Sequence, residues 1–463
     1  MSNGIASTAT PILTAAPARP AAARTKMLLE APILPTLLRL SAPNVLNLAA
    51  IAGLITFDGL FLGRLGPDVL AGVSLVFPFV MFVQHVAASG MGGAVSSAIA
   101  RALGAGDRER ANELAGHAFA LAVGMAVVFS GVMLSIGPLV YRWMGGRGGV
   151  LEAALEYSTV ALGGAVSICM LNILANVVRG TGNMAYPAAV LVACVLGHVA
   201  VSPILIFGWG PLPALGPAGA GYGLVVSFAI GSAVLFRHLR SAGSLVKLSF
   251  TALPRRWELY REFFRVGIPG MINVAINNLT VIVLTGVAGH LGREASIGYA
   301  MGARLEYIMI PLAFGFGTAL VAMVGTNWGA KQQQRARTIA WSGAATVAAA
   351  CGAVGLFFAV FPELWMGLFT DQADVIHAGT LYLRIAGPTY ALYGLGMAIY
   401  FAMQGVGHVV PAVLANALRL FVSAGGSLMA AWMFDADPLG VFAAIACGFL
   451  IYGAVNAYLL SKR

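Results

Sequence analysis

One acidic side chain, Asp58, lies in a run of otherwise apolar residues from Leu54 to Leu62. Such a run is apolar enough to lie in lipid, where an ionised carboxylate costs roughly 2.5 to 3.5 kcal/mol on insertion scales. Because low-dielectric surroundings disfavour the charged form, such a carboxyl group is suited to take up a proton on one side of a membrane and release it on the other. We therefore predict that Asp58 is a proton or cation site.

A second pair of polar residues, His198 and Ser202, lies four positions apart and therefore on one face of a helix. A histidine facing Asp58 could share its proton, whereas Ser202 can only donate or accept hydrogen bonds. We take both as candidate coupling residues. A hydrogen-bonded core histidine remains the alternative interpretation of His198.

Two further candidates for cation coupling lie in the second half of the chain. Glu306 follows Arg304 by two positions, so the two side chains do not face each other along a helix and each needs another partner. Asn277 carries a neutral oxygen of the kind that can bind a cation. We take Glu306 as the second candidate for the coupling carboxyl.

Aromatic and polarizable side chains recur at spacings of three and four from residue 382 to residue 404. One helix face of this kind suits flat cationic ligands through cation–π and thioether contacts. Packing between helices is the alternative for any single member. The candidate substrate-binding residues are Tyr390, Tyr393, Met397, Tyr400 and Gln404.

The elements that must position these residues are membrane-spanning helices. The chain has 463 residues, 59% hydrophobic and 10% charged, whereas a soluble protein carries about a quarter of its residues charged. Its apolar runs reach about 20 residues or more, the length with which an α-helix crosses ~30 Å of hydrocarbon. We predict an all-α polytopic membrane protein.

The basic residues are distributed as a membrane topology signal. The net charge is +10, and 20 of the 27 Lys and Arg residues fall in the tails or on alternate loops. The positive-inside rule then places both termini in the cytoplasm and makes the number of spans even. The excess charge therefore indicates the lipid bilayer, and not nucleic acid, as the partner.

The apolar runs form two sets of six, which repeat one unit. Arg39-x3-Pro43 matches Arg265-x3-Pro269 at an offset of 226, and Gly180-x-Gly182 matches Gly405-x-Gly407 at 225. Because each unit has an even number of spans, the two are related by an axis along the membrane normal, and a substrate site is expected between them. We predict a disordered cytoplasmic tail (1–35), an amino-terminal lobe (36–239), a cytoplasmic linker (240–261) and a carboxy-terminal lobe (262–460).

Several short motifs occur in a characteristic order along both halves. They include Phe57-Asp58-Gly59-Leu60-Phe61-Leu62-Gly63-Arg64-Leu65-Gly66, Arg179-Gly180-Thr181-Gly182-Asn183 and Pro203-Ile204-Leu205-Ile206-Phe207-Gly208. Over residues 36 to 460 the chain resembles the multidrug and toxic compound extrusion (MATE) family. The resemblance implies twelve transmembrane helices in two parallel six-helix repeats, arranged as a V-shaped two-lobe transporter.

The resemblance also bears on the candidate residues. Asp58 occupies the position of the family's first-helix aspartate, whereas many members carry Asn and Asp where this chain has His198 and Ser202. Members coupled through the carboxy-terminal lobe tend to carry a Glu near Asn277 and an Asp at the place of Tyr393. Both acids are missing here, which favours proton over Na⁺ coupling.

We therefore expect secondary active efflux of cationic or amphipathic organic compounds, small-molecule drugs or metabolites, in exchange for H⁺ or Na⁺. The expected protein is a monomer in the plasma (inner) membrane, is not an enzyme, and uses no cofactor besides the coupling ion. A flippase for lipid-linked saccharides is the nearest alternative, and it would line its cavity with several arginines. An intramembrane enzyme would need convergent catalytic groups, and the sequence contains only scattered ones.

Overall fold

The protein is almost entirely helical in the computed structural model, which describes residues 20–249, 256–433 and 438–462. About 87% of the residues in these ranges are helical, and no strand occurs among them. The predicted all-α fold is confirmed.

Twelve long helical segments follow one another in the described ranges, as predicted. The first six are α2 (Ile33–Gly63), α3–η1–α4 (Pro67–His85, Val86–Gly90, Met91–Gly104), α5 (Arg108–Trp143), α6–α7 (Gly148–Gly163, Ala165–Gly180), α8 (Ala185–Phe207) and α9 (Gly216–Arg240). The second six are α10 (Trp257–Ala288), α11–α12 (Arg293–Ala303, Glu306–Gly329), α13 (Gln333–Val360), α15–η2–α16 (Ala373–Ala386, Gly387–Thr389, Tyr390–Val406), α17–η3–α18 (Val410–Leu420, Phe421–Gly425, Gly426–Met433) and α19 (Pro438–Ser461). A short helix, α14 (Pro362–Met366), lies between α13 and α15.

Length and hydropathy identify most of these segments as membrane spans. Within the described ranges, nine helices are long and apolar enough to cross a membrane, and the bent pair α6–α7 makes ten. The remaining two segments are α2, with 31 residues, and α15–η2–α16, in which a 3-10 turn separates helices of 14 and 17 residues.

The predicted disordered tail is partly helical. Residues Pro20–Glu30 form α1, whose Leu28 is 1% exposed. The Asn327 side chain donates a hydrogen bond of 2.9 Å to the Leu28 carbonyl, and Arg335 donates one of 2.5 Å to the Ala31 carbonyl. Because these contacts fix the segment against the second repeat, the expectation of disorder is wrong for residues 20–35. Residues 1–19 lie outside the described ranges.

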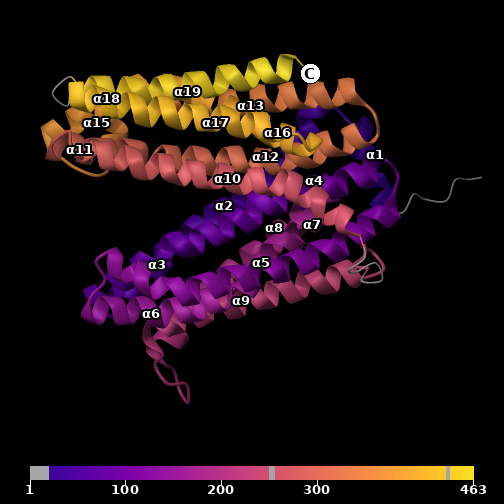
Figure 1. The fold of residues 1–463 in the computed structure, drawn as a ribbon, viewed down its shortest axis with the longest axis horizontal. Coiled ribbons are helices and arrows are strands. Elements are labelled where there is room, and N and C mark those ends of the chain that lie inside the picture. The colour runs from indigo at the N-terminus through magenta and orange to yellow at the C-terminus, as the bar shows by residue number, and fades with distance from the viewer. Residues whose placement is uncertain (1–19, 250–255, 434–437, 463) are drawn as a thin grey trace, which may run out of the picture.

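The helices form two lobes that meet at one end of the molecule and diverge toward the other (Figure 1). We call the meeting end, where α9 ends and α10 begins, the linker end. There α4 packs against α10, α12 and α16 of the second repeat. The lobes diverge toward α3 and α11, which gives the V shape.

Equivalent glycines make equivalent contacts in the two repeats. A Cβ on Gly72 would lie 2.4 Å from the Val150 carbonyl oxygen, and one on Gly298 would lie 2.8 Å from that of Val375. Both pairs are related by the offsets seen in the sequence, so the small residues at these positions allow the same close helix packing in each repeat.

Candidate functional site

The coupling candidate Asp58 lies near the end of α2 and contacts α8. His198 Nε2 is 2.7 Å from Asp58 Oδ1. The His198 side chain is fully buried, whereas that of Asp58 is 20% exposed. A single hydrogen bond therefore joins the two groups, and only the carboxyl group retains access to open space.

The partners of the imidazole ring indicate which protonation state fits. His198 Nδ1 is buried and has no hydrogen-bond partner among the described residues. A protonated Nδ1 would be a buried unpaired donor, which is costly, so the geometry favours a neutral ring that donates from Nε2 to a carboxylate. One additional proton would convert this pair to a carboxylic acid beside a neutral imidazole, or to a carboxylate beside an imidazolium.

Asp58 borders a cavity of about 220 Å³ between α2, α3, α6, α8 and α9. Most of its lining is apolar, and its other polar members are Ser74, Gln84 and Tyr157. These three were not singled out from the sequence, although Gln84 and Tyr157 are polar residues within predicted spans. A mostly apolar lining with a few polar groups is typical of small-molecule sites, although this cavity is smaller than their usual range of about 300 to 1,000 Å³.

Ser202 is not part of the contact between Asp58 and His198. It is fully buried one turn farther along α8, and its Oγ has no hydrogen-bond partner in the described part of the chain. A Cβ on Gly223 of α9 would lie 3.3 Å from Ser202 Cβ, so this side chain packs against the neighbouring helix.

Glu306 forms a separate network in the other lobe. It lies in the first turn of α12, directly after the break from α11. Tyr382 Oη donates a hydrogen bond to Glu306 Oε1, and Tyr390 Oη lies 3.4 Å from Tyr382 Oη. Glu306 therefore has phenol partners where Asp58 has an imidazole.

Asn277 contacts a buried arginine on α17. Arg419 is 4% exposed and donates hydrogen bonds of 2.9 Å to the side-chain oxygens of Asn277 and Asn416. Its guanidinium also lies over the Tyr393 ring, 5.4 Å from the centroid. The Asn277 oxygen proposed as a cation ligand thus already accepts from a cationic side chain. The sequence indicated no role for Arg419.

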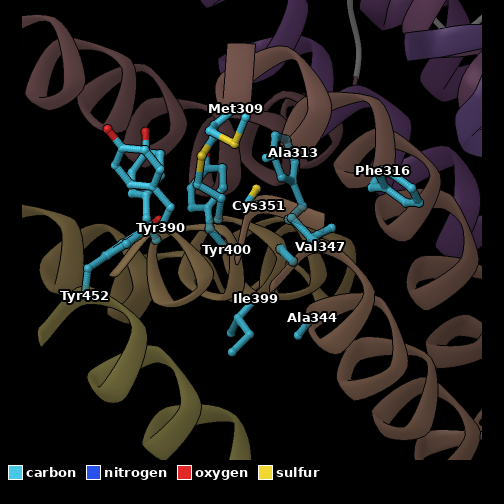
Figure 2. Packing of buried hydrophobic residues seen from close by; sticks show 14 of the residues in the cluster. Met309, Ala313, Phe316, Ala344, Val347, Cys351, Tyr390, Ile399, Tyr400 and Tyr452 are labelled. Atoms are coloured by element: carbon cyan, nitrogen blue, oxygen red, sulfur yellow. The ribbon is translucent and has the colours of Figure 1, made fainter. Parts of the chain in front are cut away.

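The candidate substrate-binding residues are all buried in this conformation. Tyr390, Tyr393, Met397, Tyr400 and Gln404 are 0 to 6% exposed. Figure 2 shows Tyr390, Tyr400 and Tyr452 among Met309, Val347 and other buried side chains. The binding role stays a prediction, and packing is the role seen in this structure.

Gln404 lies at the seam between the repeats. Its Nε2 donates a hydrogen bond of 3.0 Å to the Ser89 carbonyl in the π-helical turn η1. Eight residues after Ser89, Ser97 Oγ donates to the Gln404 carbonyl at 2.5 Å. Both contacts hold α16 against the helix segment α3–η1–α4 near the linker end.

Comparison with known proteins agrees with this architecture. The family model MatE matches residues 43–204 and 269–427, one match in each repeat. Similar proteins include the FAD transporter of Shewanella oneidensis, 23% identical over 85% of this chain and 87% of its own length. The probable multidrug resistance protein NorM of Thermotoga maritima is 24% identical over 79% of this chain and 78% of its own length.

Solved structures share the fold. An outward-facing multidrug resistance MATE family transporter of the MOP superfamily superposes with a TM-score of 0.84 at 25% identity, covering 94% of this chain and 98% of its own. The predicted resemblance to the MATE family is confirmed, and the chain is a multi-pass membrane transporter of small molecules and not an enzyme. Because the family model covers most of both repeats, the chain belongs to the MatE family of transporters.

Proposed function

We propose that this transporter exports cationic or amphipathic organic compounds in exchange for protons, with Asp58 as the coupling carboxyl group. The observation that carries the proposal is the pair formed by Asp58 and His198, 2.7 Å apart beside the cavity of about 220 Å³. An ionisable residue inside a membrane protein that pairs with another and faces a cavity is the usual form of a proton relay.

The hydrogen-bond partners of the candidate coupling residues favour proton exchange over Na⁺ exchange. Asp58 contacts a nitrogen of His198, which exchanges protons and does not bind Na⁺ when it donates a hydrogen bond. In the other lobe, Asn277 accepts from Arg419. Protonation of Asp58 would change its bond to α8, and this change would bias the packing of the amino-terminal lobe between two conformations.

The proposed setting is the plasma (inner) membrane, with both termini in the cytoplasm and the protein acting as a monomer. The linker end would then face the cytoplasm and be closed in this structure, so substrate would leave from the opposite end. The Thermotoga relative is named a probable multidrug resistance protein, which supports an organic substrate for this chain.

The test is transport of a fluorescent cationic dye by purified protein in vesicles, under a pH gradient or a Na⁺ gradient. We expect a pH gradient to drive transport and Asp58→Asn to lower the rate at least tenfold. Asp68→Asn is the matched control, since Asp68 is an exposed acid in the first turn of α3 in the same lobe. Glu306→Gln tests the runner-up carboxyl group and is expected to retain proton-driven transport.

Three results would contradict the proposal. If Asp58→Asn transports the dye at the unsubstituted rate, Asp58 is not the coupling group. If only a Na⁺ gradient drives transport, the coupling ion is Na⁺ and not H⁺. Transport of FAD, the substrate named for the Shewanella relative, without transport of the dye would replace the substrate class.

A further inference from the structure

A large cavity lies between the repeats at the linker end. It shares no lining residue with the cavity beside Asp58. Its volume is about 590 Å³, within the range of small-molecule sites. Residues of α4, α5, α10 and the end of α16 line it: Arg101, Arg110, Glu258, Arg261, Glu262, Arg265, Val266, Val406, Gly407 and His408. We call it the arginine cavity.

One carboxylate in the arginine cavity is shared between two arginines. Glu262 Oε1 accepts from Arg101 at 2.8 Å, and Oε2 accepts from Arg110 at 2.9 Å. Arg101 also donates a hydrogen bond of 3.0 Å to the Gly405 carbonyl of the second repeat and another to Ser97 Oγ of the first, so both repeats hold its guanidinium in place. Because one negative charge faces two positive ones, this group is left with a net positive charge.

The other two arginines add positive charge along α10. Arg265 Nη2 is 3.1 Å from His408 Nε2. A guanidinium has no acceptor, so the imidazole nitrogen accepts, and an accepting ring is neutral. Arg265 is thus bonded to a neutral group, and Arg261, one turn away, is exposed. With His408 neutral, four arginines and two glutamates leave the cavity two charges positive.

We propose that the arginine cavity binds a phosphate-bearing anion and that this anion holds the linker end closed. Guanidinium groups match phosphate oxygens with charge-assisted, often bidentate hydrogen bonds. The positive side chains belong to both repeats, so a multivalent anion between them would replace repulsion by attraction across the seam. Soluble phosphates and phospholipid headgroups share this chemistry. The site is independent of the coupling function proposed for Asp58.

Binding is tested on the full-length protein in nanodiscs. In neutral phosphatidylcholine, titration with inorganic pyrophosphate followed by calorimetry should show saturable binding at one site. The variant Arg261→Gln/Arg265→Gln should weaken binding at least tenfold, and both side chains are exposed, so folding should be retained. In phosphatidylglycerol discs, native mass spectrometry should show a retained lipid that the same variant loses.

A matched control removes two exposed arginines at the opposite end of the molecule. Arg64→Gln/Arg293→Gln lowers the net charge equally and should leave binding unchanged. Glu262→Gln should strengthen binding, because it removes the carboxylate that competes for Arg101 and Arg110. Binding in only one of the two discs identifies the source of the phosphate. The proposal is overturned if neither pyrophosphate nor the lipid binds, or if the Arg261→Gln/Arg265→Gln variant binds as tightly as the unsubstituted protein.

Discussion

At the scale of single residues, the hydrogen bond between Asp58 and His198 is the contact on which coupling would depend. His198 is buried, and among the described residues only its Nε2 has a hydrogen-bond partner, a geometry that favours a neutral ring beside the Asp58 carboxylate. The carboxyl group alone has access to the cavity. A proton arriving from the cavity therefore meets Asp58 first.

A double-mutant cycle should detect this bond as a coupling free energy. Asp58→Leu and His198→Leu should interact by about 1.5 to 3 kcal/mol in the free energy of unfolding, the typical contribution of a hydrogen bond to a charged group. The free energy is measured by denaturant titration in detergent. A matched cycle of Asp58→Leu with Ser202→Ala should show little coupling, since Ser202 is equally buried on α8 but has no bond to Asp58. Equal coupling in both cycles would contradict the role given to His198.

The pairing of Asp58 with His198 could be anticipated because each is an isolated ionisable residue in an apolar span. The partner of Glu306 could not, since Tyr382 lies 76 positions away on another helix. The same holds for the helix face of aromatic residues that ends at Gln404, whose neighbours the sequence did not reveal. Helical periodicity identifies one face, but it does not say what covers that face, and here α12, α13 and α19 pack against α16.

At the scale of elements, α4 and α12 cross through a reciprocal pair of glycines. A Cβ on Gly104 would lie 2.0 Å from the Thr326 carbonyl oxygen, and one on Gly329 would lie 2.0 Å from that of Arg101. The two glycines are 225 positions apart, as are the two residues whose carbonyls they meet. The crossing therefore has the pseudo-two-fold symmetry of the repeats.

Gly104→Ala should open this crossing. The added methyl group meets backbone and not a flexible side chain, so we expect the closed linker end to lose about 1 to 3 kcal/mol relative to the open form. Spin labels at Arg108→Cys and Lys331→Cys, in a Cys447→Ser background, would report a longer mean distance by pulsed electron resonance. Gly124→Ala is the control, because a Cβ on Gly124 meets nothing within 4 Å. An unchanged distance in Gly104→Ala would show that the crossing does not hold the end closed.

The repeated motifs predicted two copies of one unit, and residues at equal offsets in the two copies then occupy equivalent positions, which explains these equivalent contacts. They did not predict η1, which belongs to the first repeat. The Ala88 and Ser89 carbonyls of this π-helical turn accept hydrogen bonds from Asn176 and Gln404. These partners lie 88 and 315 positions away along the chain, so no local pattern in the sequence reveals them.

At the scale of the whole molecule, the basic residues concentrate at the end where the two lobes meet. The end at which the lobes meet carries the arginine cavity and the start of α10, and the lobes diverge toward the end that carries the turn between α8 and α9 (Figure 1). Of the 27 basic residues, 20 fall in the tails or on the loops assigned to the linker end. By the positive-inside rule, we propose that the closed end faces the cytoplasm.

This orientation can be tested with single cysteines labelled from outside intact cells. In a Cys447→Ser background, Trp209→Cys should react with a membrane-impermeant maleimide, because Trp209 is 73% exposed in the turn between α8 and α9. Ala242→Cys, exposed just after α9 at the linker end, should react only after the membrane is permeabilised. The three remaining cysteines, Cys169, Cys194 and Cys351, are buried and should not react. The opposite labelling pattern would contradict the proposed orientation. The closed end would then face outward, and this conformation would be the one that takes up substrate from the cytoplasm.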